Sequence, residues 1–523
     1  MPAWFAMQIP LSPSDEYNRV LLEHAHPPGW ENPTPPGRYN LVAIGGGTAG
    51  IIAALGTAGL GGRSALVERH LLGGDCLNYG CVPSKALIRS ARAVYQLGLG
   101  DQYGFRLGEA ARVADAPRAL EQAADFAAVM ERMRRLRARI SHHDSAQRFT
   151  GLGVDVYLGE ARFTGRSTLE VDGRSLRFRR AVIATGGRAA TPDIEHLAEV
   201  GYLTNETVFS LTELPRKLIV VGAGPVGCEL AQSFRRFGSE VHLVGRGEQI
   251  LAKEAPEAAR LIRDQFEREG MHLHLGWSTR LAERMGDSKS LTIERGGEKK
   301  KLIADAILVA AGRQANVEGL NLEAAGVNYT TGGIEVNDRL RTSNRAIYAA
   351  GDVCSKYQFT HAADAMARLC VQNALFFGRR KVSRLVIPRC TYTDPEVAHV
   401  GLTESEARRQ GIELDSYRVE LSEVDRAVVD GEEHGFAVVH CKRGSGHVVG
   451  GTIVAEHAGE MIGELTMLIT HRLSLAVLAR TIHCYPTQVE VLKRIADNYS
   501  RTRLTPLAAK VSAKWLAWSR GRR

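Results

Sequence analysis

A glycine-rich turn that follows an apolar strand and opens a helix constrains the fold of this 523-residue chain most, and the chain has two such turns. In the first, the apolar residues 40–44 lead into the turn, and residues 64–67 form the next predicted strand, which ends at Glu68. The turn contains three regularly spaced glycines, Gly45, Gly47 and Gly50. Such glycines let backbone N–H groups approach a pyrophosphate, and the acid accepts hydrogen bonds from ribose hydroxyls. A purely structural turn is the alternative.

The second turn repeats this design with one difference. It lies between the predicted strands 217–221 and 240–244, and its glycines are Gly222, Gly224 and Gly227. No carboxylate ends the second strand, and Arg246 follows it instead. An arginine there suits a 2′-phosphate, which favours NADPH over NADH. The alternative is an exposed arginine and relaxed cofactor choice.

A close pair of cysteines follows the first unit. Four residues lie between Cys76 and Cys81. The two cysteines precede a predicted helix at residues 85–94 that begins with Lys85. A helix N-terminus and a nearby cation lower the pKa of a thiol, so this spacing favours redox chemistry. Metal binding needs two further ligands at short spacing, and none occurs, so we expect no metal site.

Composition excludes several classes of protein. The chain is 44% hydrophobic and 24% charged, typical of globular domains, and its length suggests about three of them. No apolar run is long enough to span a bilayer and no secretory signal is visible, so a cytoplasmic protein is expected. The formal net charge is +9, but residues 501–523 hold seven basic and no acidic side chains, which leaves 60 basic and 58 acidic residues before them. A near-neutral body argues against nucleic-acid binding.

With both turns and the cysteine pair in view, the chain resembles the flavin-dependent pyridine nucleotide–disulfide oxidoreductases over roughly residues 38–500. The resemblance implies an α/β fold with two Rossmann-like dinucleotide-binding domains and a C-terminal α+β dimerisation domain, working as a homodimer. The boundaries it implies are an N-terminal extension at 1–37, an FAD-binding domain at 38–200 and 326–386, an NAD(P)-binding domain at 201–325, an interface domain at 387–500 and a basic tail at 501–523.

The resemblance also implies residue roles. The first unit would bind FAD and the second the nicotinamide cofactor. Cys81 would form the thiolate under the flavin, Cys76 would meet the substrate, and Lys85 would reach the flavin paired with Glu229; the alternative is an unrelated surface lysine and a glutamate on a helix face. Further cofactor contacts are expected at Ala161, Thr185, Gly186, Gly312, Gly351 and Asp352.

One departure from the family pattern narrows the substrate. Tyr485 occupies the position where disulfide-reducing members have a proton-shuttling histidine, while the orienting Glu490 is retained. A phenol shuttles protons poorly near neutral pH, so the chain is similar to mercuric-reductase-like members, which reduce a soft metal ion held by thiolates. A dihydrolipoamide dehydrogenase or a reductase of small disulfides is the enzymatic alternative, and a non-enzymatic redox sensor is a lesser one.

Several features stand outside this scheme. His483 is expected to be packed or capping rather than a displaced base, and Cys484 and the isolated cysteines are expected in the core; the latter are Cys228, Cys354, Cys370, Cys390 and Cys441. Residues 1–37 are Pro-rich and predicted to be an extended arm, and the arginines of a helix at 126–140 are predicted to be solvated. The tail forms a predicted amphipathic helix that starts near Pro506. It either docks on the protein's own dimer surface or lies on an anionic membrane.

Overall fold

The computed structural model describes residues 11–104, 124–376 and 378–521. The chain divides into two bodies. The first contains residues up to Ile250 together with Phe266–Leu385, and the second contains Leu251–Gln265 together with Val386–Arg523. Both turns and the cysteine pair lie in the first body, and the Tyr485 segment lies in the second.

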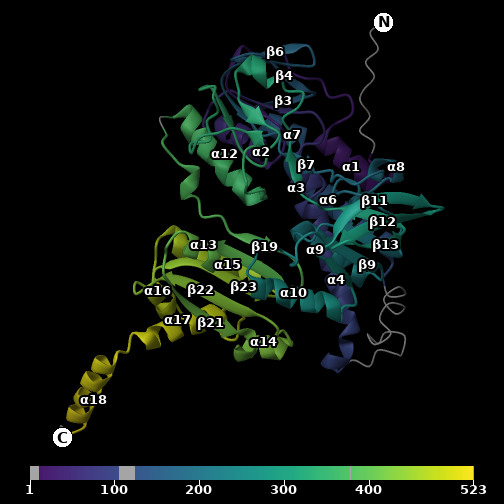
Figure 1. Ribbon diagram of the computed structural model, residues 1–523. Helices are drawn as coiled ribbons and strands as arrows, with labels where there is room; N and C mark the ends of the chain where they lie inside the picture. Colours follow the sequence, from purple (N-terminus) through teal and green to yellow (C-terminus); the bar gives the residue numbers. More distant parts are fainter. Residues whose placement is uncertain (1–10, 105–123, 377, 522–523) are drawn as a thin grey trace. The chain divides into compact units, whose positions relative to one another are not determined.

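The first glycine turn lies in a seven-stranded sheet (Figure 1). Its strand order is β3-β2-β1-β6-β5-β4, with β18 also paired to β6, and the strands are β1 (Arg38–Ile44), β2 (Ser64–Glu68), β3 (Val154–Leu158), β4 (Ala161–Gly165), β5 (Thr168–Val171), β6 (Arg174–Ile183) and β18 (Ile347–Ala349). The apolar β1 is buried on both faces from Leu41 onward because it is central and parallel to β2 and β6. Two helices accompany this sheet and pack on each other, α2 (Thr48–Gly59) and α12 (Thr360–Leu375).

The second turn lies in a four-stranded parallel sheet of order β10-β9-β8-β14. Its elements are β8 (Lys217–Val221), α9 (Pro225–Arg236), β9 (Glu240–Gly245), β10 (His272–Leu275) and β14 (Ala306–Val309). An antiparallel sheet contributes to the same core cluster and consists of β11 (Ser278–Met285), β12 (Ser288–Arg295) and β13 (Glu298–Ala304). Both predicted strand–turn–helix–strand units are therefore present.

Shorter elements connect these sheets. Two small antiparallel pairs join β7 (Gly187–Ala189) to β15 (Arg313–Ala315) and β16 (Tyr329–Thr330) to β17 (Gly333–Ile334). Among the described residues of the first body, the remaining α-helices are α3 (Gly74–Asn78), α4 (Cys81–Gly98), α7 (Ala146–Gly151), α8 (Leu197–Val200) and α11 (Leu322–Ala325), besides α1 (Glu16–Ala25) and α6 (Phe126–Ser141). The predicted helix after the cysteine pair is thus α4, and Cys81 is its first residue.

The extended arm that we predicted for residues 1–37 is wrong at residues 16–25, and residues 1–10 of that segment lie outside the described residues. Residues Glu16–Ala25 form helix α1, which packs on α6 (Phe126–Ser141). The prediction of solvated arginines on α6 is wrong for Arg134 and Arg137, both of which are buried. Arg134 pairs with Asp15 at 2.5 Å, and Arg137 donates to the Asn18 side chain at 2.7 Å. The prediction failed because the partners lie more than 100 residues away in sequence.

The second body is built on a five-stranded antiparallel sheet of order β19-β20-β23-β22-β21. The strands are β19 (Arg389–Thr391), β20 (Glu396–Gly401), β21 (Leu414–Glu420), β22 (Phe436–Lys442) and β23 (Val448–Ala455). Its helices are α10 (Pro256–Arg268, most of which groups with this body), α13 (Glu404–Arg409), α14 (Asp425–Asp430), α15 (Ala458–Thr470), α16 (Leu475–Arg480) and α17 (Glu490–Thr502). Helices α15, α16 and α17 share one apolar core with the sheet. The predicted α/β fold with a C-terminal α+β domain is confirmed.

The chain ends in the predicted tail helix, α18 (Pro506–Arg520), which buries none of its residues. Thr505 caps its first turn by accepting from the Ala508 N–H, and Pro506 fills the first helical position. Among the described residues, no helix combines the length and hydropathy needed to cross a membrane.

Candidate functional site

The glycines of the first turn serve two purposes that the structure separates. A Cβ atom at Gly50 would lie 1.8 Å from the Gly45 carbonyl oxygen, and one at Gly45 would lie 2.3 Å from the Ala184 carbonyl oxygen. These two glycines are therefore required by close backbone packing. A Cβ at Gly47, where α2 begins, would come no closer than 3.7 Å to another residue, so the open space above the helix N-terminus is left for a ligand.

The second turn reproduces this arrangement. A Cβ at Gly227 would lie 1.8 Å from the Gly222 carbonyl oxygen, and one at Gly222 would lie 2.3 Å from the Ala310 carbonyl oxygen. Gly224 precedes the first residue of α9, and a Cβ there would meet no atom within 4 Å. Both turns thus present a free helix N-terminus of the kind that binds a pyrophosphate, which fits two dinucleotides.

Glu68 occupies the end of β2 beside the first turn. Its carboxylate accepts from the Gly46 N–H at 2.5 Å and from the His70 N–H at 2.7 Å. Burial raises the pKa of this carboxyl, while those N–H groups oppose the shift. Glu68 lines a cavity together with the predicted cofactor contacts Gly45, Ala161 and Thr185. A polar cavity beside the turn suits the adenosine end of a dinucleotide.

The predicted crossover segment lies at the same cavity. Thr185 donates to the Asn316 carbonyl at 2.7 Å, and the Asn316 N–H donates to the Gly186 carbonyl at 3.0 Å. Asn316 also lines the cavity, and it was not singled out in the sequence. The two strands that lead to and from the nicotinamide unit are therefore joined here by hydrogen bonds.

Arg246 follows β9, where Glu68 ends β2 in the first unit. Its side chain is exposed and forms no ion pair with any described residue. A guanidinium without an acidic partner is free to bind a phosphate group. The two units therefore share the turn and differ in the charge at the end of the second strand.

The two cysteine thiols lie together at the start of α4. Both are free thiols in the structure, which corresponds to the reduced pair. Cys81 Sγ lies 3.3 Å from the Thr360 hydroxyl. The hydrogen bond from Cys76 lowers the pKa of Cys81 most, and the hydrogen bond from Thr360 and the charge of Lys85 lower it further. The same hydrogen bond between the two thiols raises the pKa of Cys76. The two shifts have opposite directions, so a proton leaves Cys81 more easily than Cys76.

Lys85 lies one turn further along α4 and forms an ion pair with Glu229 of α9 at 2.8 Å. The glutamate side chain is 7% exposed and the lysine 37%. The alternative of an unrelated lysine and glutamate is wrong. The pair joins α4, which begins at Cys81, to α9, which begins at the second glycine turn.

Asp352 is partly buried, and an arginine that contacts two acids connects it to the cysteine motif. Arg313 contacts Asp75 at 2.7 Å and Asp352 at 3.2 Å. Burial raises the pKa of Asp352, and the arginine opposes that shift. Gly351 and Gly312, the neighbours of these residues, both have a positive φ. The sequence suggested Asp352 alone; the roles of Asp75 and Arg313 were visible only as positions beside Cys76 and Gly312.

In the second body, Tyr485 and Glu490 belong to one network without contacting each other. The Tyr485 hydroxyl donates to Asp425 at 2.8 Å, Arg494 pairs with Asp425 at 3.3 Å, and Arg494 also pairs with Glu490 at 3.1 Å. The hydrogen bond to Asp425 raises the pKa of Tyr485 above that of an ordinary phenol. Asp425 and Arg494 were missed because neither belongs to a recognisable motif.

The residues beside Tyr485 partly contradict the sequence analysis. Cys484 is exposed rather than buried. His483 pairs with Glu464 of α15 at 3.2 Å, and its own side chain is 7% exposed. Among the isolated cysteines, Cys354 and Cys390 are only partly buried, contrary to expectation, whereas Cys228, Cys370 and Cys441 are buried.

Comparison with known proteins identifies the class. The pyridine nucleotide-disulphide oxidoreductase family matches residues 39–367, and the dimerisation domain of the same family matches residues 387–496. Over 466 residues the chain is 34% identical to the mercuric reductase of Staphylococcus aureus, covering 89% of this chain and 83% of the relative. It is 32% identical to the dihydrolipoyl dehydrogenase of Chlamydia muridarum, covering 87% of this chain and 95% of the relative.

Solved structures agree with this assignment. The HOCl-induced flavoprotein disulfide reductase RclA of Escherichia coli superposes with a TM-score of 0.76 at 25% identity, covering 88% of this chain and 99% of the other. LpdA of Mycobacterium tuberculosis superposes with a TM-score of 0.78 at 24% identity, with the same coverage of each chain. The glycine turns fit FAD and a pyridine nucleotide, and the C-terminal body matches a dimerisation domain. The chain therefore belongs to the pyridine nucleotide-disulphide oxidoreductase family and is an FAD-dependent enzyme.

Proposed function

We propose that the enzyme oxidises NADPH and passes two electrons, by way of FAD and the Cys76–Cys81 pair, to a soft metal ion or a thiol-bound substrate. The choice of substrate rests on Tyr485. Its hydroxyl donates to Asp425, and it is not paired with Glu490 as a catalytic base would be. The non-enzymatic alternative is set aside because the family and the named relatives are enzymes.

The chain's own residues divide the work at the thiol pair. FAD, when bound, supplies the two-electron relay between nicotinamide and the dithiol. Thr360 and Lys85 stabilise Cys81 as thiolate, and Cys76 keeps its proton until it meets the substrate. The Lys85–Glu229 pair holds a cation beside the helix that begins with Cys81, where the positive charge of Lys85 stabilises negative charge on the thiolate and on a reduced flavin.

The proton balance favours a metal ion. Reducing a disulfide substrate produces two leaving thiolates that need protons, whereas a metal ion held by two thiolates needs ligand exchange and two electrons. Tyr485 is a weak donor for the first task, because its hydrogen bond to Asp425 raises its pKa further above neutral. Mercury is the soft ion named by several relatives.

The deciding assay compares electron acceptors. Purified enzyme should oxidise NADPH with Hg(II) in excess thiol faster than with lipoamide or glutathione disulfide, and Cys81→Ala should abolish turnover with each. Turnover with a disulfide alone would refute the metal-ion substrate. Failure of NADPH to reduce the bound flavin would refute the proposed electron path.

A disulfide substrate is the second candidate, supported by His483. This histidine lies two residues before Tyr485 and pairs with Glu464, which is the kind of carboxylate–imidazole pair that moves protons. His483→Ala should lower disulfide turnover at least about tenfold if this pair replaces the absent base, with Tyr485→Phe as the matched control. Equal activity in wild type and His483→Ala would remove this candidate.

We propose that the Tyr485 segment completes the active site of the partner subunit. The dimerisation domain supports a homodimer, and Tyr485 lies within the range that this domain matches. If Cys81→Ala and Tyr485→Ala subunits, each inactive alone, are unfolded and refolded as an equal mixture, one site in each mixed dimer keeps both native residues. About a quarter of wild-type activity should then return. No recovery would mean that both residues serve the same subunit's site.

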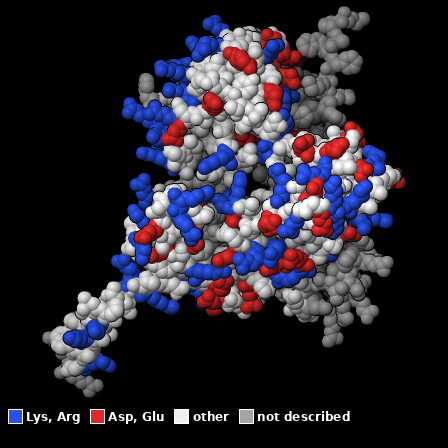
Figure 2. Space-filling model, in the orientation of Figure 1, with Lys and Arg blue, Asp and Glu red and all other residues white. Residues whose placement is uncertain are grey.

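We also propose that the enzyme is cytoplasmic and that its tail helix binds an anionic lipid surface. Figure 2 shows basic but no acidic side chains on α18, and the helix exposes Leu507, Val511, Trp515 and Trp518 at spacings that place them on one face. Full-length protein should float with vesicles containing phosphatidylserine, and a 1–500 truncation should not. Flotation of both, or of neither, would exclude this role for the tail.

A further inference from the structure

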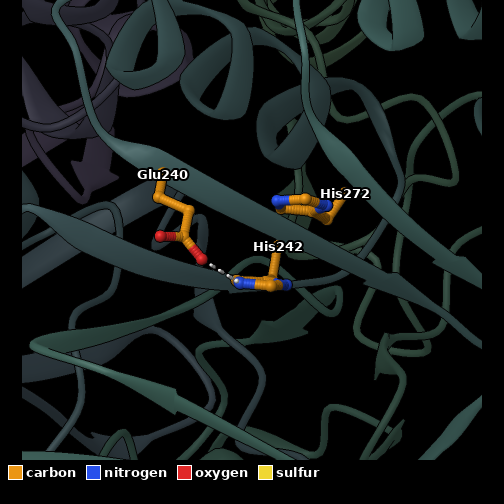
Figure 3. A group of neighbouring side chains, drawn as sticks. All are labelled: Glu240, His242 and His272. Carbon is orange, nitrogen blue, oxygen red and sulfur yellow. Dashed lines mark hydrogen bonds and ion pairs between the residues drawn. The ribbon is translucent and has the colours of Figure 1, made fainter. Parts of the chain in front are cut away.

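Three potential metal ligands meet at the opposite end of the nicotinamide unit from its glycine turn. Among the described residues, Glu240, His242 and His272 form the one group of three such side chains whose ligand atoms all lie within 4.8 Å of one another. Figure 3 shows the Glu240 carboxylate bonded to the His242 ring, with the His272 ring lying over it. Nothing described above uses these residues.

The sheet brings them together. Glu240 and His242 are two residues apart on β9 and therefore share a face, and His272 is the register partner of His242 on the adjacent β10. The glycine turn and Arg246 lie at the carboxyl ends of these parallel strands, whereas Glu240 and His272 are the first residues of theirs. The group is therefore separate from the nucleotide site.

We propose that Glu240, His242 and His272 bind one divalent zinc-class ion that links β9 to β10. Two imidazoles and a carboxylate form a ligand set that zinc accepts, with a fourth position open to water. Glu240 Oε1 and His242 Nε2 are 3.1 Å apart. That separation is close to the roughly 3.3 Å between two ligands of a tetrahedral zinc ion.

The neighbouring contacts orient two of the three ligands. His242 Nδ1 lies 3.1 Å from His274 Nε2, so the ring nitrogen that faces away from the carboxylate has its own partner. Lys217 holds the other carboxylate oxygen of Glu240 at 2.9 Å and leaves Oε1 for an ion. A partner behind each metal ligand is typical of metal sites, because it fixes the ligand's orientation.

His272 supplies the adjustable ligand. It is exposed and has no hydrogen bond to any described residue, so its ring can turn toward the ion without breaking a hydrogen bond. Its ring centroid is 4.7 Å from that of His242, and the planes are 19° apart. Turning the His272 ring out of this stack would direct one of its nitrogens to the ion.

Two lysines oppose a cation here and set the expected strength of binding. Lys217 contacts Glu240, and the charge of Lys300 on β13 acts on both His242 and His274. Lys300→Gln should consequently tighten zinc binding, and weaker binding in that variant would overturn the placement of the ion.

The test is a zinc titration of full-length, FAD-loaded protein in which Cys76 and Cys81 are oxidised and other accessible thiols are blocked with N-ethylmaleimide. We expect one zinc ion per chain in competition with a chromophoric chelator, and a thermal midpoint that rises with zinc concentration. His272→Ala and Glu240→Gln should each weaken binding at least about tenfold.

The matched control is His196→Ala. His196 also lies within hydrogen-bonding distance of a carboxylate, 2.9 Å from Glu199, but belongs to no group of three ligands in the described chain. Its removal should leave zinc binding unchanged. Absence of a stoichiometric zinc ion in thiol-blocked wild type, or unchanged affinity in both His272→Ala and Glu240→Gln, would overturn the proposal. NADPH reduction of the flavin is measured separately, so failure of the electron path would not be confused with failure of the zinc site.

Discussion

The two glycine turns are alike in their backbone packing and differ in the sign of the charge that lies beside them. In both, the third glycine would place a Cβ 1.8 Å from the carbonyl oxygen of the first, and in both the middle glycine borders open space. The first unit then presents the carboxylate of Glu68, and the second presents the guanidinium of Arg246. Backbone geometry therefore fits the class of ligand, a dinucleotide, and we propose that one side chain at the end of the second strand distinguishes between dinucleotides.

The largest expected effect breaks one turn at a time. Gly50→Ala should give protein without bound flavin, because its Cβ would collide with the Gly45 carbonyl. Gly227→Ala should keep the flavin but lose about a hundredfold or more in reduction by NADPH, since overpacking of this kind costs several kcal/mol. Flavin absorbance and stopped-flow reduction measure the two losses.

Gly59→Ala is the control for these variants. Gly59 ends α2, the helix that contains Gly50 in its first turn, and a Cβ at Gly59 meets no atom within 4 Å. It should bind flavin and react as wild type does. If Gly227→Ala lost its flavin as well, the two turns would not serve separate ligands.

The next largest effect is expected when the charge at the end of the second strand of the second unit is reversed. Arg246→Glu should raise the Michaelis constant for NADPH about ten- to a hundredfold and leave that for NADH within a few-fold, because the 2′-phosphate loses its cation and meets an acid. Steady-state kinetics with both nucleotides test this. Arg280→Glu, at an exposed arginine on β11, controls for net charge. A parallel rise for both nucleotides would show that Arg246 does not read the phosphate.

Removing the charge of the first unit should have a smaller effect. Glu68→Gln should weaken FAD binding about tenfold, since a neutral amide would accept weaker hydrogen bonds from the ribose hydroxyls than the carboxylate does. Fluorescence of released flavin measures the dissociation constant, with the exposed Glu170→Gln of β5 as control. Unchanged affinity would mean that the carboxylate serves only the Gly46 and His70 N–H groups.

The smallest effect concerns the thiol pair that only the first unit possesses. Lys85 lowers the pKa of Cys81, so Lys85→Met should move the pH midpoint of Cys81 alkylation in the reduced enzyme upward and reduce its thiolate fraction at pH 7. Iodoacetamide labelling rates across pH, followed by peptide mapping, give that midpoint. An identical midpoint in Lys85→Met would leave Cys76 and Thr360 as the sources of the shift.

Features that depend on neighbouring residues or on a family position were predictable from the sequence, whereas features that join residues far apart in the sequence were not. The turns, their strands, the cysteine motif, the Lys85–Glu229 pair and the helix at Pro506 were predictable because each has a local pattern or a family position. The Tyr485–Asp425–Arg494 network was not, because its members meet only after α14 and α17 pack in one body. The same is true of Glu240 and His272, which strand pairing joins across 32 residues of sequence.

The N-terminal helix shows where sequence similarity ends and the folding unit continues. Family similarity begins at residue 39, yet Asp15 and Asn18 of the preceding segment supply partners for Arg134 and Arg137 on α6. A fragment trimmed to the matched range would lose the Asp15–Arg134 ion pair, the Asn18–Arg137 hydrogen bond and the packing of α1 on α6. Recombinant forms of this enzyme should therefore begin before Asp15 rather than at the edge of the matched family domain.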